Sequence, residues 1–244
     1  VMESIVKTRY LEKIYGEHET KVIALDKIDI EFFSGEFTAI MGPSGSGKST
    51  LLHCLAGLDT PTNGSIYISN TDLSQLNDKQ LTKLRRDSFG FVFQAFNLIP
   101  TLTAAENISL PSSIAGNSPE QEWVDKIIET LDLKDRLGHR PNELSGGQQQ
   151  RVAVARALAT KPEVIFADEP TGNLDSTSSE ELLVFLKTIV TELSQTIIMV
   201  THDSEAASYA DRVVFLRDGS IFNDLKRPTK EEIISTVSDI SIKG

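Results

Sequence analysis

One glycine-rich pattern places the strongest constraint on the fold: Gly42, four further residues, then Gly47, Lys48 and Ser49. The apolar run 37–41 before it is typical of a strand, and the leucines after it are spaced for one face of a helix. A glycine loop between a strand and a helix turns backbone N–H groups toward an anion. We therefore expect a phosphate-binding loop made of Gly42, Pro43, Ser44, Gly45, Ser46, Gly47, Lys48, Ser49 and Thr50.

Two loop side chains and two distant carboxylates suit a nucleotide and its metal. The loop pattern implies that Lys48 reaches the β- and γ-phosphates and that the Ser49 hydroxyl binds Mg²⁺. The apolar run 164–167 ends in Asp168 and Glu169, as expected of a buried strand that delivers carboxylates to the ligand-binding edge of a parallel sheet. We expect Asp168 to join the Mg²⁺ site, directly or through a water, and Glu169 to deprotonate the attacking water.

A second candidate anion site lies at 144–148, where the sequence reads Leu-Ser-Gly-Gly-Gln. Ser145 is a good helix N-cap, Gly146 and Gly147 expose backbone N–H groups, and a helical pattern follows. Two anion sites for one triphosphate are best explained by a shared ligand. We expect Ser145, Gly146, Gly147 and Gln148 to contact the nucleotide.

The segment 144–148 is also where the chain resembles the ATP-binding cassette (ABC) family, whose signature motif reads LSGGQ. The resemblance extends, motif by motif, over essentially the whole chain. It implies that Tyr15 stacks under adenine, that Gln94 contacts Mg²⁺ and the attacking water, and that His202 holds the γ-phosphate. It also implies that Asp175, in the run Asn-Leu-Asp, crosses a dimer interface.

The fold that the resemblance implies is α/β: a P-loop NTPase of the ABC-ATPase type. It consists of a parallel-sheet core, an antiparallel β subdomain and an inserted α-helical subdomain. We expect one nucleotide-binding domain over 1–244, with its core at 1–94 and 163–244 and its helical subdomain at 95–162.

Local patterns add three structural expectations. Apolar and polar residues alternate over 22–33, which predicts one half-buried antiparallel strand. Ser118 and Gln121 predict a capping box at the start of a helix, and Thr229 with Glu232 predicts one for a short final helix.

Composition narrows the class of protein. The chain has 244 residues, and no apolar run approaches the roughly 20 that span a bilayer, so we expect a soluble intracellular enzyme without direct membrane insertion. A net charge of −11 argues against nucleic acid as a partner. The single cysteine, Cys54, argues against disulfides and zinc and is expected in the core. His18, His53 and His139 show no ligand-like spacing and are assigned no site.

By resemblance, the function is that of an ATP-binding and ATP-hydrolysing subunit with Mg²⁺ as cofactor. Two copies would dimerise on ATP and drive a separate integral membrane permease at the cytoplasmic face of the membrane. The insertion 16–21 and the run 94–111 resemble the lipoprotein-release and macrolide-export branch. A proline-containing loop holds four large apolar residues, of which some are expected to fold into the helical lobe and the remainder, by resemblance, to line the groove for the permease: Phe96, Leu98, Ile99 and Leu102.

One alternative function stays open, and two others are opposed by the sequence. An ATPase that regulates a cell-envelope hydrolase or sensor, without moving solute, is the alternative. Compact motif spacing opposes a DNA-repair ATPase, and the presence of one cassette with a pI of 4.9 opposes a ribosome-associated factor. The transported substrate and its direction belong to the permease.

Overall fold

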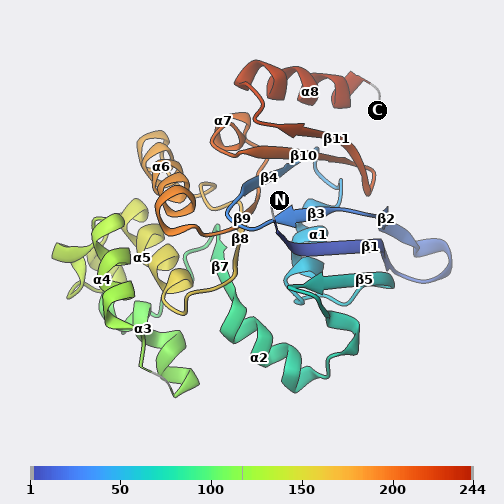
Figure 1. Ribbon diagram of the computed structural model, residues 1–244. Coiled ribbons are helices and arrows are strands. Elements are labelled where there is room, and N and C mark those ends of the chain that lie inside the picture. The colour runs from blue at the N-terminus through green and yellow to red at the C-terminus, as the bar shows by residue number, and fades with distance from the viewer. Residues whose placement is uncertain (1–2, 117, 243–244) are drawn as a thin grey trace.

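The computed structural model describes residues 3–116 and 118–242 and contains two sheets (Figure 1). The larger sheet has six strands: β4 (Phe37–Met41), β7 (Phe89–Phe93), β8 (Val164–Asp168), β9 (Ile197–Val200), β10 (Arg212–Arg217) and β11 (Ser220–Lys226). Their order is β11-β10-β4-β9-β8-β7, parallel throughout except for the antiparallel edge strand β11. β4 and β9 are buried along their whole length, which explains why they read as continuous apolar runs.

Four helices pack on the two faces of this sheet: α1 (Lys48–Leu55), α6 (Ser176–Leu193), α7 (Ser204–Ala207) and α8 (Lys230–Ile242). On one face, Leu51 of α1 joins Ile40 of β4 in a buried cluster. On the other, Leu186 of α6 and Ile233 of α8 join Ala39 of the same strand. Successive residues of a strand point to opposite faces, so β4 contributes to both cores.

The smaller sheet is antiparallel and has five strands: β1 (Ser4–Tyr15), β2 (Val22–Ile28), β3 (Glu31–Phe33), β5 (Asn63–Ile68) and β6 (Thr71–Asp72). The expectation of a single strand over 22–33 is wrong, because β2 pairs with the second half of β1 and β3 with the first half. The break follows Lys27, whose backbone is left-handed (φ 50°), and at Asp29 the carboxylate accepts a hydrogen bond from the Tyr10 N–H (2.6 Å).

Four further helices belong to the segment between β6 and β8: α2 (Asp78–Ser88), α3 (Ala104–Ala115), α4 (Gln121–Thr130) and α5 (Gly146–Leu158). The last three, which we call the helical lobe, gather on one side of the molecule, at the left in Figure 1. The predicted capping box at Ser118 is wrong: α4 begins after Glu120, which makes no side-chain cap and pairs with Lys161 instead. The Trp123 indole N–H donates to the Leu158 carbonyl (2.8 Å) and ties α4 to α5.

The capping box of the last helix is confirmed, because the Thr229 N–H donates to Glu232 (2.7 Å) and the Glu232 N–H donates to Thr229 (3.2 Å). With 13 residues, α8 is longer than the short helix expected.

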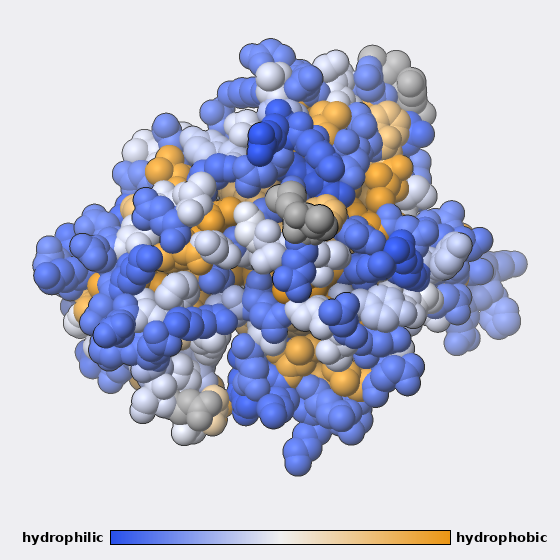
Figure 2. Space-filling model, in the orientation of Figure 1, coloured by the Kyte–Doolittle hydropathy of each residue, from blue (hydrophilic) through white to orange (hydrophobic). Residues whose placement is uncertain are grey.

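The face of the molecule in Figure 2 is mostly hydrophilic, with smaller apolar areas. Across the residues that the structure describes, no helix combines the length and apolar character required to cross a membrane. Short 3₁₀ turns complete the chain: His18–Thr20, Leu73–Gln75, Lys134–Arg136 and Pro141–Glu143.

Candidate nucleotide-binding site

The P-loop (42–50) connects the carboxyl end of β4 to the start of α1, in the order that the sequence predicts. Gly47 is the N-cap of α1 and has a left-handed backbone (φ 98°), and a side chain there would collide with the Ala24 carbonyl oxygen. Gly45 is also left-handed (φ 79°) and faces open space. The loop backbone is therefore open to an anion at the N-terminus of a helix.

Lys48 and Ser46 place polar groups inside this loop. Lys48 Nζ donates to the carbonyl oxygens of Gly42 (2.8 Å) and Pro43 (2.9 Å). Burial lowers the pKa of Lys48, and two neighbouring carboxylates act in the opposite direction. Ser46 Oγ is buried and has no hydrogen-bond partner among the described residues. The Lys48 ammonium has three N–H donors and lines the open side of the loop, so it can also donate to a phosphate, and the loop fits the anion that its sequence predicts.

Two carboxylates meet the P-loop from the end of β8. Ser49 Oγ lies 3.4 Å from Oδ1 of Asp168, the last residue of that strand. Glu169 follows with a left-handed backbone (φ 47°), and its N–H donates to the Val200 carbonyl (2.9 Å). This backbone conformation is costly for glutamate and is concentrated at functional sites.

His202 joins this group from the adjacent strand. It lies just beyond β9, and its Nδ1 is 2.8 Å from Oε1 of Glu169. The His202 side chain is 75% exposed, whereas that of Glu169 is 20% exposed. The carboxylate is therefore held in place while the imidazole keeps a face open to a ligand.

A cavity of about 400 Å³ lies at this edge of the sheet. Lys48, Glu169 and His202 line it, together with Val237 and Ile240 near the end of α8. The contribution of α8 to this cavity does not follow from the sequence. Its apolar spacing predicts a packed helix, but spacing alone does not say which surface the helix covers.

The same edge of the sheet suits Mg²⁺. The Ser49 hydroxyl and the Asp168 carboxylate are the hard oxygen ligands that this ion prefers. No group of three or more His, Cys, Asp or Glu side chains in the described part of the chain could hold a metal by itself. An ion here would therefore take its remaining ligands from water and the nucleotide phosphates, as Mg²⁺ commonly does.

Gln94 does not join this cluster within one chain. It is exposed after β7, where its Nε2 donates to Oδ1 of Asn173 (3.1 Å) and its backbone carbonyl accepts from Nδ2 of Asn173 (3.0 Å). Gly172 packs against the same side chain. These bonds link Gln94 to the segment that follows Glu169, and its contacts with metal and water stay predictions.

Tyr15 is the last residue of β1 and keeps much of its ring accessible. The residue is 42% exposed, and its hydroxyl donates to Oδ2 of Asp59 (2.6 Å). The Lys13 ammonium lies 4.8 Å from the ring centroid. One face of the ring is therefore occupied by a cation, and an adenine base would stack on the other.

We expect Tyr15→Ala to weaken ATP binding by roughly 1–3 kcal/mol, the usual contribution of a base stacked on an aromatic ring. Tyr15→Phe is the control, because it keeps the ring and removes only the hydroxyl that bonds to Asp59. Calorimetric titration with ATP measures both, and GTP should still bind. Equal affinity for Tyr15→Ala and the unchanged chain would move the adenine platform elsewhere.

The segment 144–148 starts α5 in the helical lobe. Ser145 Oγ accepts from the Gln148 N–H (3.3 Å), and Gln148 Oε1 accepts from the Ser145 N–H (3.0 Å), which forms a capping box. Ser145 is exposed, but Gly147 is buried against Ser178. Gly146 is partly exposed, and the predicted contacts of both glycines with the nucleotide stay predictions.

Asp175 has a clear local role as the N-cap of α6. Its carboxylate accepts from the Ser178 N–H (2.9 Å) and the Ser178 hydroxyl (2.9 Å), and these bonds hold its pKa below the ordinary value. Its predicted place at a dimer interface stays a prediction.

His53 is an unexpected neighbour of the site. It was assigned no role, yet its Nε2 lies 3.5 Å from Oδ2 of Asp168. The available signal was its spacing of four residues from Ser49, which places both on one helix face. Cys54, the next residue, is fully buried as predicted, and burial raises the pKa of its thiol to about 12.

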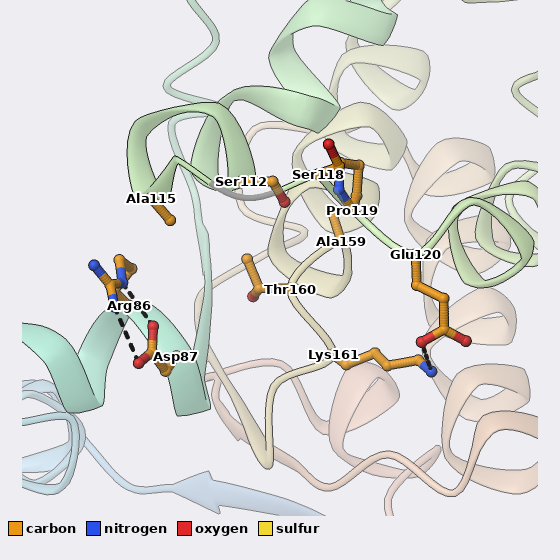
Figure 3. A pocket seen from close by; sticks show the side chains of 10 residues that line it. All are labelled: Arg86, Asp87, Ser112, Ala115, Ser118, Pro119, Glu120, Ala159, Thr160 and Lys161. Atoms are coloured by element: carbon orange, nitrogen blue, oxygen red, sulfur yellow. Dashed lines mark hydrogen bonds and ion pairs between the residues drawn. The ribbon is translucent and has the colours of Figure 1, made fainter.

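A second cavity, of about 320 Å³, lies between the end of α2 and the helical lobe (Figure 3). Both cations that line it are paired, Arg86 with Asp87 and Lys161 with Glu120. It opens beside the start of β7, and parallel strands place their ligands at the opposite, carboxyl end. Of these two cavities, the one at the P-loop therefore suits a nucleotide.

The P-loop, the paired carboxylates and the histidine at one sheet edge define a P-loop nucleotide hydrolase. The chain belongs to the ABC transporter family, whose model matches residues 25–172. It is an ATP-binding and ATP-hydrolysing part of such a transporter, working with Mg²⁺, and the expected ABC-ATPase fold is confirmed. Tyr15, Asp175 and His202 lie outside the matched residues.

Known proteins similar to this chain agree with that assignment. The uncharacterized ABC transporter ATP-binding protein MJ0796 of Methanocaldococcus jannaschii is 46% identical, over 91% of this chain and 97% of that protein. The macrolide export ATP-binding/permease protein MacB of Marinobacter nauticus is 46% identical, over 90% of this chain but 34% of MacB. A dimeric structure of MJ0796 in a post-hydrolysis state, bound to ADP and Pi, has a TM-score of 0.81 and 43% identity, covering 92% of this chain and 99% of that chain.

Proposed function

We propose that two copies of this chain close on two ATP molecules and thereby drive a membrane permease from the cytoplasmic face of the membrane. In each site, one copy supplies the P-loop and Tyr15, and the other supplies the segment 144–148. One observation carries this proposal: no residue of 144–148 lines the cavity that holds Lys48 and Glu169. Two anion sites on separate surfaces of one chain can share a ligand when a second copy faces the first.

Within the closed site, Glu169 accepts a proton from the water that attacks the γ-phosphorus, and ADP leaves. The bond to His202 orients the carboxylate of Glu169, and the imidazole with Lys48 stabilises the charge on the transferring phosphoryl group. Ser49 and Asp168 hold Mg²⁺, with Gln94 approaching on closure. Mg²⁺ held by these residues would supply positive charge against the phosphates.

The mechanical step uses two subdomains, with the core at 1–94 and 163–244 and the helical subdomain at 95–162. The helical lobe lies between β7 and β8 in the chain, and Gln94 bonds to Asn173 across the two ends of that insertion. The dimer would exchange between an open and a closed state, and a nucleotide shifts that equilibrium only by binding one state more tightly than the other. ATP favours the closed dimer, and ADP favours the open one.

The similarity to MacB supports a permease as the partner, since its name joins ATP binding to a permease in one protein. The same similarity disfavours an ATPase that only regulates an envelope hydrolase or sensor. Purification of the tagged chain from detergent-solubilised membranes tests this directly. We expect an integral membrane protein to co-purify, and ATP hydrolysis by the complex to respond to its transported substrate. A chain that purifies without any membrane protein would contradict the proposed partner.

The loop after Gln94 offers a specific test of the docking surface. Ile99 is 38% exposed, whereas Leu98 packs against the buried core, so Ile99 is the better site for a charge substitution. Buried Asn107 accepts from the Ile99 N–H (2.8 Å) and donates to its carbonyl (3.2 Å), which fixes the loop independently of the Ile99 side chain.

We expect Ile99→Asp to leave ATP binding by the isolated chain unchanged and to reduce co-purification with the permease several-fold, because a charge would be buried in an apolar contact. Ile114→Asp is the matched control, since Ile114 is 76% exposed on α3. Pull-down and ATP titration are run side by side. Full complex formation by Ile99→Asp would place the docking surface elsewhere.

A further inference from the structure

His53 lies on the side of α1 that faces the end of β8. It follows Ser49 by four residues, and residues at this spacing share one face of a helix. Ser49 Oγ is 3.4 Å from Oδ1 of Asp168, and His53 Nε2 is 3.5 Å from Oδ2 of the same carboxylate. Two side chains of one helix therefore face the two oxygens of one acid.

The two contacts suit different roles. Mg²⁺ prefers oxygen ligands in a near-ideal octahedron, so the Ser49 hydroxyl suits direct coordination and an imidazole nitrogen does not. A neutral imidazole carries one N–H, which can donate to a carboxylate and fix its orientation. The strict geometry of Mg²⁺ makes the orientation of Asp168 matter, because rotation of the carboxylate would move Oδ1 away from Ser49.

We propose that His53 is a positioning residue for the Mg²⁺ site. With its proton on Nε2 and a small approach from 3.5 Å, it would donate to Oδ2 of Asp168 and hold Oδ1 toward Ser49 and the nucleotide. The inference rests on the proposed function, because it takes Ser49 and Asp168 as the residues that hold the ion. Removal of a hydrogen bond to a metal-binding group typically reduces metal affinity or activity by about 10–100-fold.

The test compares His53→Ala, His53→Gln and His139→Ala with the unchanged chain. His139 does not line the P-loop cavity, so His139→Ala controls for the loss of a histidine. Binding of a fluorescent ATP analogue at a fixed low concentration is measured in EDTA and across a titration of free Mg²⁺. Thermal unfolding of each protein is followed as well. Neither readout requires turnover, and the His53 side chain is 41% exposed, so its replacement should not unfold the chain.

His53→Ala should need about tenfold more free Mg²⁺, or more, for half of the Mg²⁺-dependent rise in nucleotide affinity. In EDTA, the nucleotide affinity of His53→Ala should equal that of the unchanged chain. His53→Gln should show a smaller shift of the Mg²⁺ midpoint than His53→Ala, and His139→Ala should show no shift. An unshifted Mg²⁺ midpoint, or an equal loss of affinity in EDTA, would overturn the positioning role and leave the proposed function intact. Failure of the unchanged chain to bind nucleotide would overturn both.

Discussion

Glu169→Gln should bind ATP with Mg²⁺ normally and lose almost all turnover. The amide keeps the size of the carboxylate and can still meet His202, but it cannot accept the proton of the attacking water. A positioned general base contributes about 10²–10⁴-fold to a rate, so phosphate release should fall by at least two orders of magnitude. Release of phosphate under saturating ATP measures this loss.

Glu169→Asp is the companion variant, because it keeps a base with a shorter reach and should retain more activity than Glu169→Gln. Calorimetric titration checks that both variants still bind ATP. Substantial phosphate release by Glu169→Gln would remove Glu169 from the role of base.

The second large effect concerns sites shared between two copies. Lys48→Ala removes one copy's contact with the phosphates and keeps Ser145, whereas Ser145→Arg has the reverse defect. Alone, each variant carries its defect in both sites of a dimer and should hydrolyse little ATP. In a mixed dimer, one site combines both intact halves and the other combines both defects, so hydrolysis should rise above that of either variant alone.

Mixing a differently tagged sample of each variant and isolating the doubly tagged dimer makes this measurement direct. A mixture of two samples of the same variant is the control, because it cannot form an intact site. Normal activity of Ser145→Arg alone would show that the segment 144–148 does not contact the nucleotide.

Contiguous motifs made much of this molecule predictable. The P-loop and the pair Asp168-Glu169 each sit where a strand ends, and strand, loop and helix follow one another in the sequence. Parallel strands carry their ends to one edge, so motifs that are far apart in the chain, including His202, could be expected to meet there.

Features that depend on partners distant in the sequence were harder to predict. Glu120, and not Ser118, is the N-cap of α4, and its side chain pairs with Lys161. Lys161 is far from Glu120 in the sequence, so local sequence patterns do not predict this pair. Ile240 reaches the P-loop cavity because α8 packs in the same core as α6, and that placement depends on tertiary packing. Metal-ligand spacing does not reveal His53, because its contact is with the predicted ligand Asp168 and not with the ion itself.

The mass of the Glu169→Gln protein in solution tests the two-copy site most directly. Blocked hydrolysis should keep ATP in place and hold two copies together, whereas ADP should not. With ATP and Mg²⁺, light scattering should give about 54 kDa, twice the 26.8 kDa of one chain, and with ADP it should give 26.8 kDa. A mass of 26.8 kDa under conditions where calorimetry shows ATP to be bound would contradict a site shared between two copies.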